Sequence, residues 1–213
     1  MRRRGGGAEY DRRLALLAIV WGVALAWSGW APYDRATWWM EVAPVLVALP
    51  VLVATRARLP LTGLALGLIG AHGLVLMLGG AYTYARVPLG FEVQQWLGLA
   101  RNPYDRFGHL MQGFVPAIVL REVAIRTGAL RPGAFLSLCV VAWCLAISAT
   151  YELIEFAAAV ALGQGADAFL GTQGDPWDTQ WDMLMCLLGA VLALALLSRV
   201  HDTALRRMGA HAG

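Results

Sequence analysis

Residues 61–82 read LTGLALGLIGAHGLVLMLGGAY, an apolar run that only His72 interrupts with an ionisable side chain. About 20 such residues are enough for a helix to cross the hydrocarbon core of a bilayer. Other apolar runs of similar length occur along the chain. The sequence therefore predicts an all-α polytopic membrane protein with about six transmembrane helices in one bundle, at residues 14–30, 38–55, 61–82, 109–125, 134–162 and 181–197.

The composition indicates the same class of protein. Hydrophobic residues make up 59% of the 213 residues and charged residues 15%, against roughly 45–50% and about 25% in soluble domains. This excess of apolar side chains excludes a soluble enzyme, a secreted disulfide scaffold and a disordered linker. All 17 basic residues are arginine and the net charge is only +3, which gives no reason to expect a nucleic-acid partner.

Charged residues are distributed unevenly between the two sides of the predicted bundle. With a cytoplasmic amino terminus, the inner segments carry thirteen arginines and four acids, and the outer segments four arginines and ten acids. Because cytoplasmic loops are enriched in arginine, we expect a multi-pass protein of the cell inner membrane with both termini cytoplasmic. Residues 1–213 are expected to form a single domain, made of an arginine-rich leader (1–13), the helix bundle (14–197) and a mobile tail (198–213).

Two outer segments are longer than the other connections. Residues 83–108 include a stretch, Leu89–Leu99, whose apolar residues fall at helical spacing, so we expect it to lie flat in the membrane interface. Residues 163–180 are rich in Gly, Asp, Gln and Thr, a composition typical of an ordered loop.

Polar residues that interrupt the membrane segments fall into three motifs on the predicted outer side. Ionisable groups inside a membrane are costly unless they are paired or hydrated, so each motif is a candidate site. Helical spacing places Asp105, His109 and Gln112 on one face, and likewise Glu152 with Glu155 and Asp178 with Asp182. The candidate ligand-binding residues are Arg101, Asp105, Arg106, His109, Gln112, Glu152, Glu155, Gln173, Asp175, Asp178 and Asp182.

Such a concentration of carboxylates needs counter-charge, from a metal ion, arginine partners, protons or water. Carboxylates with one histidine suit a divalent cation such as Mg²⁺, Mn²⁺, Ca²⁺ or Zn²⁺, and the candidate ligands are His109, Glu152, Glu155 and Asp182. The alternative is a set of ion pairs and helix caps that hold the outer loops against the bundle. Asp178 in particular is placed to cap the last helix.

These motifs resemble those of the YjdF-type family of bacterial inner-membrane proteins, whose function is not established. The matching stretches run from Arg101 to Ala117, through Arg121-Glu122 and Tyr151-Glu152-x-x-Glu155, and from Phe169 to Met183. A fainter similarity is to VanZ-like membrane proteins, linked to glycopeptide-antibiotic resistance. Their Asp-Lys-x-x-His, Glu-x-x-Gln and Asp-x-x-x-Asn-x-x-Gly elements are matched in part, with Arg106, Glu155 and Cys186 standing for Lys, Gln and Asn. The resemblance implies a shared helix arrangement and no particular reaction.

Three functions fit these observations. The first is an outer site for an anionic lipid or lipid-linked phosphate, with Arg106, His109 and Arg101 on the phosphate and the carboxylates on a bridging cation. In a hydrolytic version His109, Glu152 or Glu155 would act as general acid or base. No nucleophile motif accompanies them, so whether the protein is an enzyme stays open, as does its oligomeric state.

The second function is a proton- or cation-coupled transporter that uses Glu41, His72, Glu152 and Glu155 as a relay. The third is a structural or accessory membrane protein in which the polar cluster only locks the loops.

Overall fold

The structure is a computed structural model, and it describes residues 4–162 and 172–209. All regular structure in these residues is helical. The elements are α1 (Arg4–Trp30), α2 (Arg35–Thr55), α3 (Gly63–Tyr82), the 3₁₀ turn η1 (Tyr84–Arg86), α4 (Pro88–Leu97), α5 (Tyr104–Arg126), α6 (Ala134–Leu162) and α8 (Asp178–Arg207).

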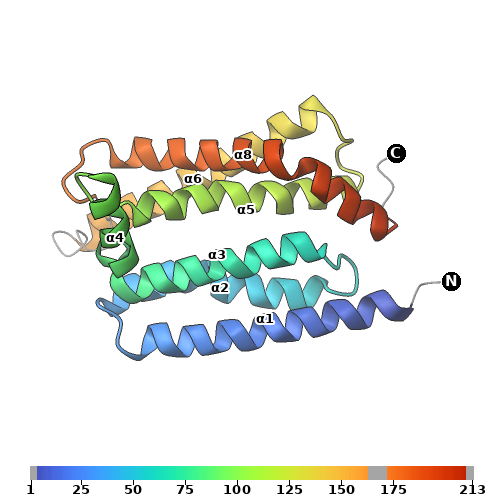
Figure 1. Cartoon of the computed structure of the whole chain (residues 1–213), viewed down its shortest axis with the longest axis horizontal. Helices are drawn as coiled ribbons and strands as arrows, with labels where there is room; N and C mark the ends of the chain where they lie inside the picture. Colours follow the sequence, from blue (N-terminus) through green and yellow to red (C-terminus); the bar gives the residue numbers. More distant parts are fainter. Residues whose placement is uncertain (1–3, 163–171, 210–213) are drawn as a thin grey trace.

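Six long helices lie alongside one another, and α1 begins at the same end of the bundle as α8 finishes (Figure 1). We call this the terminal end and the opposite one the distal end. Among the described residues, α1, α2, α3, α6 and α8 are each long and apolar enough to cross a membrane. The 23-residue α5 is more polar, but it runs alongside them and packs between α3 and α8, so it is the sixth long helix of the bundle. The predicted all-α polytopic bundle is confirmed.

The helices extend beyond the apolar runs that predicted them. Helix α1 begins at Arg4 instead of Leu14, α5 at Tyr104 instead of His109, and α8 ends at Arg207 instead of Leu197. Hydropathy locates only the part of a helix inside the hydrocarbon, whereas backbone hydrogen bonding continues into the polar layer. The expected mobile tail is therefore helical as far as Arg207.

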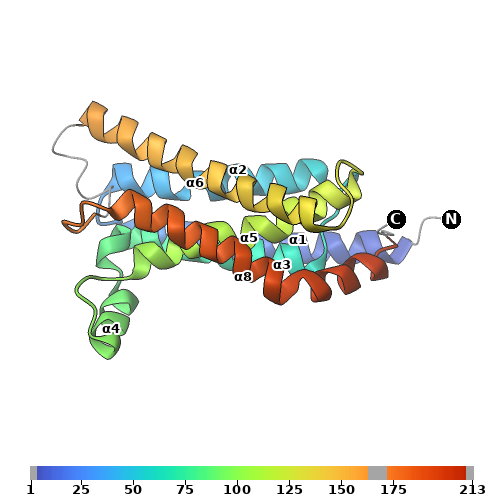
Figure 2. The same cartoon turned by 90° about the horizontal axis from the view of Figure 1, so that it is seen from above.

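Helix α4 lies across the distal end and projects to the side of the bundle opposite α2 and α6 (Figure 2). Pro88 occupies its first turn, and Gly98 ends it with a left-handed φ of 62°. Leu89, Trp96 and Leu97 are all exposed, as expected for a helix at the membrane interface. Of the second long segment, residues 163–171 lie outside the described part, and residues 172–177 form turns that lead into α8.

The α5–α8 pair is the most closely packed in the bundle and positions the candidate site. A Cβ atom on Gly113 would lie 1.9 Å from the backbone oxygen of Cys186, and one on Gly189 2.0 Å from that of Leu110. The two backbones therefore touch, as small residues allow in membrane helices. This contact fixes the side chains of α5 one to two turns before Gly113 beside the first turns of α8.

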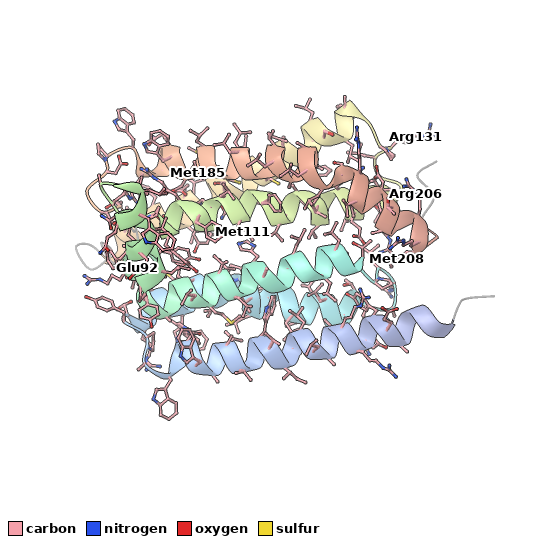
Figure 3. The ribbon with its side chains drawn as sticks, viewed as in Figure 1. Glu92, Met111, Arg131, Met185, Arg206 and Met208 are labelled. Atoms are coloured by element: carbon pink, nitrogen blue, oxygen red, sulfur yellow. The ribbon has the colours of Figure 1, made fainter. Side chains whose placement is uncertain are left out.

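Charge separates the two ends of the molecule. Figure 3 shows Arg131 and Arg206 at the terminal end and Glu92 at the distal end. The arginines of α1, of the α2–α3 connection and of the last turns of α5 and α8 all belong to the terminal end. The polar motifs singled out from the sequence lie at the distal end.

Candidate ligand site

Two arginines hold the segment before α8 against the start of α5. Arg101 forms an ion pair with Asp178 and donates to the backbone oxygen of Thr172 at 3.1 Å. Arg106 pairs with Asp175 at 2.7 Å and lies over the ring of Trp181, 5.0 Å from its centroid. We call these contacts the clamp. Arg101 also lies 3.5 Å from Asp105, which lines the cavity described below, whereas Asp175 and Asp178 do not line it.

Gln173 completes the clamp through the backbone. Its amide accepts from the backbone nitrogen of Asn102 at 3.1 Å and donates to the Asn102 carbonyl at 3.0 Å. Gln173 has a φ of 48°, a left-handed conformation that is uncommon for a residue with a side chain. Two reciprocal hydrogen bonds compensate for that strain, so this turn is fixed in place.

Deeper in the bundle, His109 is surrounded by carboxylates from three helices. Its Nε2 lies 3.8 Å from Asp105 Oδ1 on its own helix and 3.9 Å from Asp182 Oδ2 on α8. Its Nδ1 lies 3.2 Å from Gln112 Oε1 and 3.8 Å from Glu152 Oε1 on α6. In the tautomer that carries its proton on Nδ1, this nitrogen donates to Gln112 and the lone pair of Nε2 faces Asp105 and Asp182.

The three groups around Nε2 have the spacing of a metal site. One ligand atom from each of Asp105, His109 and Asp182 lies within 4.8 Å of the other two. Ligands held about 2.1 Å from one ion lie about 3.0–4.2 Å apart, so a small closure would bring all three onto a cation. Asp182 Oδ1 and Glu152 Oε1 are buried with no hydrogen-bond partner among the described residues. Such oxygens are costly unless a cation or a proton satisfies them.

A second group of polar side chains lines the neighbouring wall. Glu41 of α2 is buried and accepts from the Tyr151 hydroxyl at 3.0 Å. The Tyr84 hydroxyl is a second donor to the same carboxyl. Burial raises the pKa of Tyr84 well above its ordinary value, so this hydroxyl stays protonated and can donate. His72 Nε2 and the Glu155 carboxyl have no hydrogen-bond partner among the described residues.

Most of these groups line a cavity of about 570 Å³ between α2, α3, α5 and α6, a volume typical of ligand pockets. The polar residues on its wall are Glu41, His72, Asp105, His109, Gln112 and Glu155, whereas Glu152 and Asp182 are not among the lining residues. Its α5 wall is a single stripe from Asp105 to Val123, about 27 Å long at 1.5 Å per residue. Past Gln112 towards the terminal end, the α5 wall is Val115, Pro116, Val119, Leu120 and Val123. The cavity is therefore long, narrow, polar at the distal end and apolar elsewhere.

The candidate residues from the sequence fall into two sets. Asp105, His109, Gln112, Glu152 and Asp182 meet at the ring of His109, and Glu155 lies on the cavity wall beside them. The other set forms the clamp: Arg101, Arg106, Gln173, Asp175 and Asp178. The three residues that fit a metal include Asp105 in place of the expected Glu152 and Glu155, because Glu152 faces the other ring nitrogen.

A second buried network, at the terminal end, was missed by the sequence reasoning. The Glu122 carboxylate accepts from the backbone and hydroxyl of Thr62 at 2.7 and 2.6 Å, and it lies 3.0 Å from His201 Nε2. Arg121 lies 2.8 Å from His201 Nδ1 and pairs with Asp202 at 2.6 Å. His201, expected in a mobile tail, is fully buried. The signal was present as two adjacent charges late in a membrane helix.

The bundle and this site define a polytopic helical membrane protein with a buried, carboxylate-rich site at the end opposite its termini. The chain belongs to the family described as "Predicted membrane protein (DUF2238)", whose model matches residues 13–203. It is 53% identical over 192 residues to Inner membrane protein YjdF of Escherichia coli (strain K12), covering 90% of this chain and 92% of that relative. No solved structure matches the chain. The family and the inner-membrane assignment predicted from the motifs are confirmed.

Proposed function

We propose that the protein binds a lipid whose head group carries a phosphate, with the head group at the distal site and a hydrocarbon chain in the cavity. The observation that carries this proposal is the continuity of the two parts. Asp105, His109 and Gln112 line the same cavity as the apolar stripe that ends at Val123. An amphiphile matches such a cavity from end to end.

The dimensions of the cavity favour a chain over a compact ligand. A volume of 570 Å³ spread over about 27 Å gives a mean cross-section on the order of 20 Å², which suits one extended hydrocarbon chain. Access from the bilayer would lie between α2 and α6, because α2 packs mainly on α3 and α1 and meets α6 through the Tyr151–Glu41 hydrogen bond. Val51 and Ile147 on these two helices line the cavity and are exposed.

A divalent cation is the group that would join a phosphate to this site. Both arginines expected on the phosphate, Arg101 and Arg106, are paired with aspartates of the clamp. Asp105, His109 and Asp182 would hold the cation, and Glu152 with Gln112 would fix the histidine ring through its other nitrogen. The cation would supply the positive charge that the phosphate needs. We assign binding and no turnover.

Titration of the purified protein with Mn²⁺, followed by electron paramagnetic resonance, tests the cation site. We expect one Mn²⁺ per chain, no binding in His109→Ala, and about 10- to 100-fold weaker binding in Glu152→Gln, which loses only a partner of the ring. Glu92→Gln, an exposed acid at the same end, is the matched control and should bind normally.

Lipid content is read from the same samples. Phosphate-bearing lipid that co-purifies with the wild-type protein should be lost on chelation and absent from Asp182→Asn. If folded, monodisperse His109→Ala retained both the Mn²⁺ and the lipid of the wild-type protein, the proposal would be wrong.

A transporter is the second candidate, because Glu41, His72 and Glu155 all line the cavity. A proton or cation relay needs polar groups to continue towards the terminal end. The remaining cavity wall there is almost entirely apolar, including Leu52, Leu61 and Val123. The apolar wall therefore favours a binding site over a transport pathway. Proton flux into proteoliposomes that contain the protein would instead favour a transporter.

A further inference from the structure

The lipid site has a second, separate polar wall, which points to the kind of head group it takes. We infer that the head group carries a primary ammonium as well as a phosphate, with the ammonium held by Glu155, Glu41 and His72. This inference rests on the proposed function and narrows it from phosphate lipids in general to aminophospholipids.

Charge balance is the first step. Three carboxyls line the cavity, those of Glu41, Asp105 and Glu155, together with the imidazoles of His72 and His109. Two more carboxyls, those of Glu152 and Asp182, face the His109 ring. One divalent cation offsets part of this charge, and a phosphate would then add negative charge back. Arg101 lies 3.5 Å from Asp105, but no arginine lines the cavity among the described residues, and the chain contains no lysine. A purely anionic head group would add negative charge beside these carboxyls, whereas an ammonium would offset it.

The second step is that the acceptors lie apart from the candidate cation site. Glu155 is 9% exposed, lines the cavity and has no hydrogen-bond partner among the described side chains. It does not belong to the group of three that fits a metal. Its carboxyl is therefore available to the ligand while the cation occupies Asp105, His109 and Asp182.

The third step compares the hydrogen-bond acceptors on this wall with the N–H groups of a primary ammonium. A primary ammonium has three N–H groups and needs three acceptors when it leaves water. Glu155 supplies one, and His72 Nε2 on α3, buried without a partner, supplies another. Glu41 supplies the third, on a carboxyl that Tyr151 and Tyr84 already hold in place. A quaternary ammonium has no N–H groups and would leave all three acceptors unsatisfied.

Competition between defined lipids tests the inference. The protein, loaded with Mn²⁺ in detergent, is offered phosphatidylethanolamine, phosphatidylcholine or phosphatidylglycerol with identical chains, and bound lipid is counted by native mass spectrometry. We expect the wild-type protein to prefer phosphatidylethanolamine by about tenfold, because charge-assisted hydrogen bonds to a buried carboxylate are lost with the other two. Glu155→Gln should abolish the preference, Glu155→Asp should restore part of it, and Mn²⁺ binding should not change in either variant.

The outcomes separate this inference from the proposed function. Equal or better binding of phosphatidylglycerol by the wild-type protein would overturn the ammonium assignment and leave the cation-bridged lipid site intact. A preference that survives in folded Glu155→Gln would also overturn it. Soluble phosphoethanolamine, which lacks chains, is expected to bind far more weakly. If it bound as well as the lipid, the ammonium assignment would stand and the lipid assignment would fail.

Discussion

Glu122 connects three parts of the bundle through the contacts of one side chain. Its fully buried carboxylate accepts from Thr62, faces His201 and is approached by Arg126 at 3.1 Å, so it connects α5, α8 and the start of α3. Thr62 in turn caps α3 through Ala65. The arrangement satisfies a buried charge with donors on every side, which is the condition under which such a charge is tolerated.

Asp34 carries a prediction for stability and its dependence on pH. Its side chain caps α2 by accepting from the backbone nitrogen of Thr37 at 2.7 Å, and this hydrogen bond lowers the pKa of Asp34. Asp34→Ala should cost about 1 kcal/mol at pH 7, measured as a lower midpoint of thermal unfolding in detergent.

The sign of the pH effect follows from the direction of the shift. A lowered pKa in the folded protein stabilises it above the pKa of the unfolded chain, near 3.8, and this contribution is lost as the pH falls through the folded value. The difference between wild type and Asp34→Ala should therefore shrink below about pH 4. A difference that stayed constant down to pH 3 would contradict the charge-dependent part of the cap.

At the scale of the helices, apolar runs predicted that six helices exist and where they cross, but not where they end. The arginine-rich start of α1 and the polar last turns of α8 carry no hydrophobic signal. The spacing of Asp105 and His109 correctly placed both on one face of α5. Spacing could not predict that Arg101 and Arg106 would pair with the aspartates of the clamp, because those contacts depend on the position of residues 172–178 in the folded protein.

The α5–α8 contact gives a prediction at this scale. Gly113→Ala should destabilise the protein by at least about 1–3 kcal/mol, the usual cost of overpacking, since the added Cβ would meet a backbone oxygen that cannot rotate away. Gly67→Ala, on α3, meets nothing within 4 Å and serves as the control, with stability unchanged or slightly raised. Thermal unfolding in detergent measures both. Equal midpoints for the two variants would contradict the close approach.

For the whole molecule, the separation of charge predicts its direction in the membrane. In a background without Cys139, Cys144 and Cys186, Trp96→Cys on α4 should react with an impermeant maleimide in intact spheroplasts. Met208→Cys should react only after permeabilisation, because the arginine-rich terminal end is expected in the cytoplasm. Both positions are exposed, at 83% and 44%. The reverse labelling pattern would place the site on the cytoplasmic side.

The sequence predicted the residues of the site but not how they come together. Because ionisable side chains are costly inside a membrane, His109, Glu152 and Asp182 could each be identified from the sequence as unusual residues. Their meeting at one ring, and the cavity beside it, depend on the packing of α5 against α8 and on how α2, α3 and α6 surround α5. Neither feature has a pattern in the sequence of a single helix.

The position of α5 has a consequence for how the chain is made. This helix contains Asp105, Arg106, Arg121 and Glu122, and it packs against α3, α6 and α8. Each charged residue near the centre of a segment opposes partitioning from the translocon into lipid by about 2.5–3.5 kcal/mol, and less towards its ends. Helix α5 is therefore poorly suited to enter the bilayer alone during synthesis. We expect it to remain beside the translocon until α6 and α8, which pack against it, have emerged.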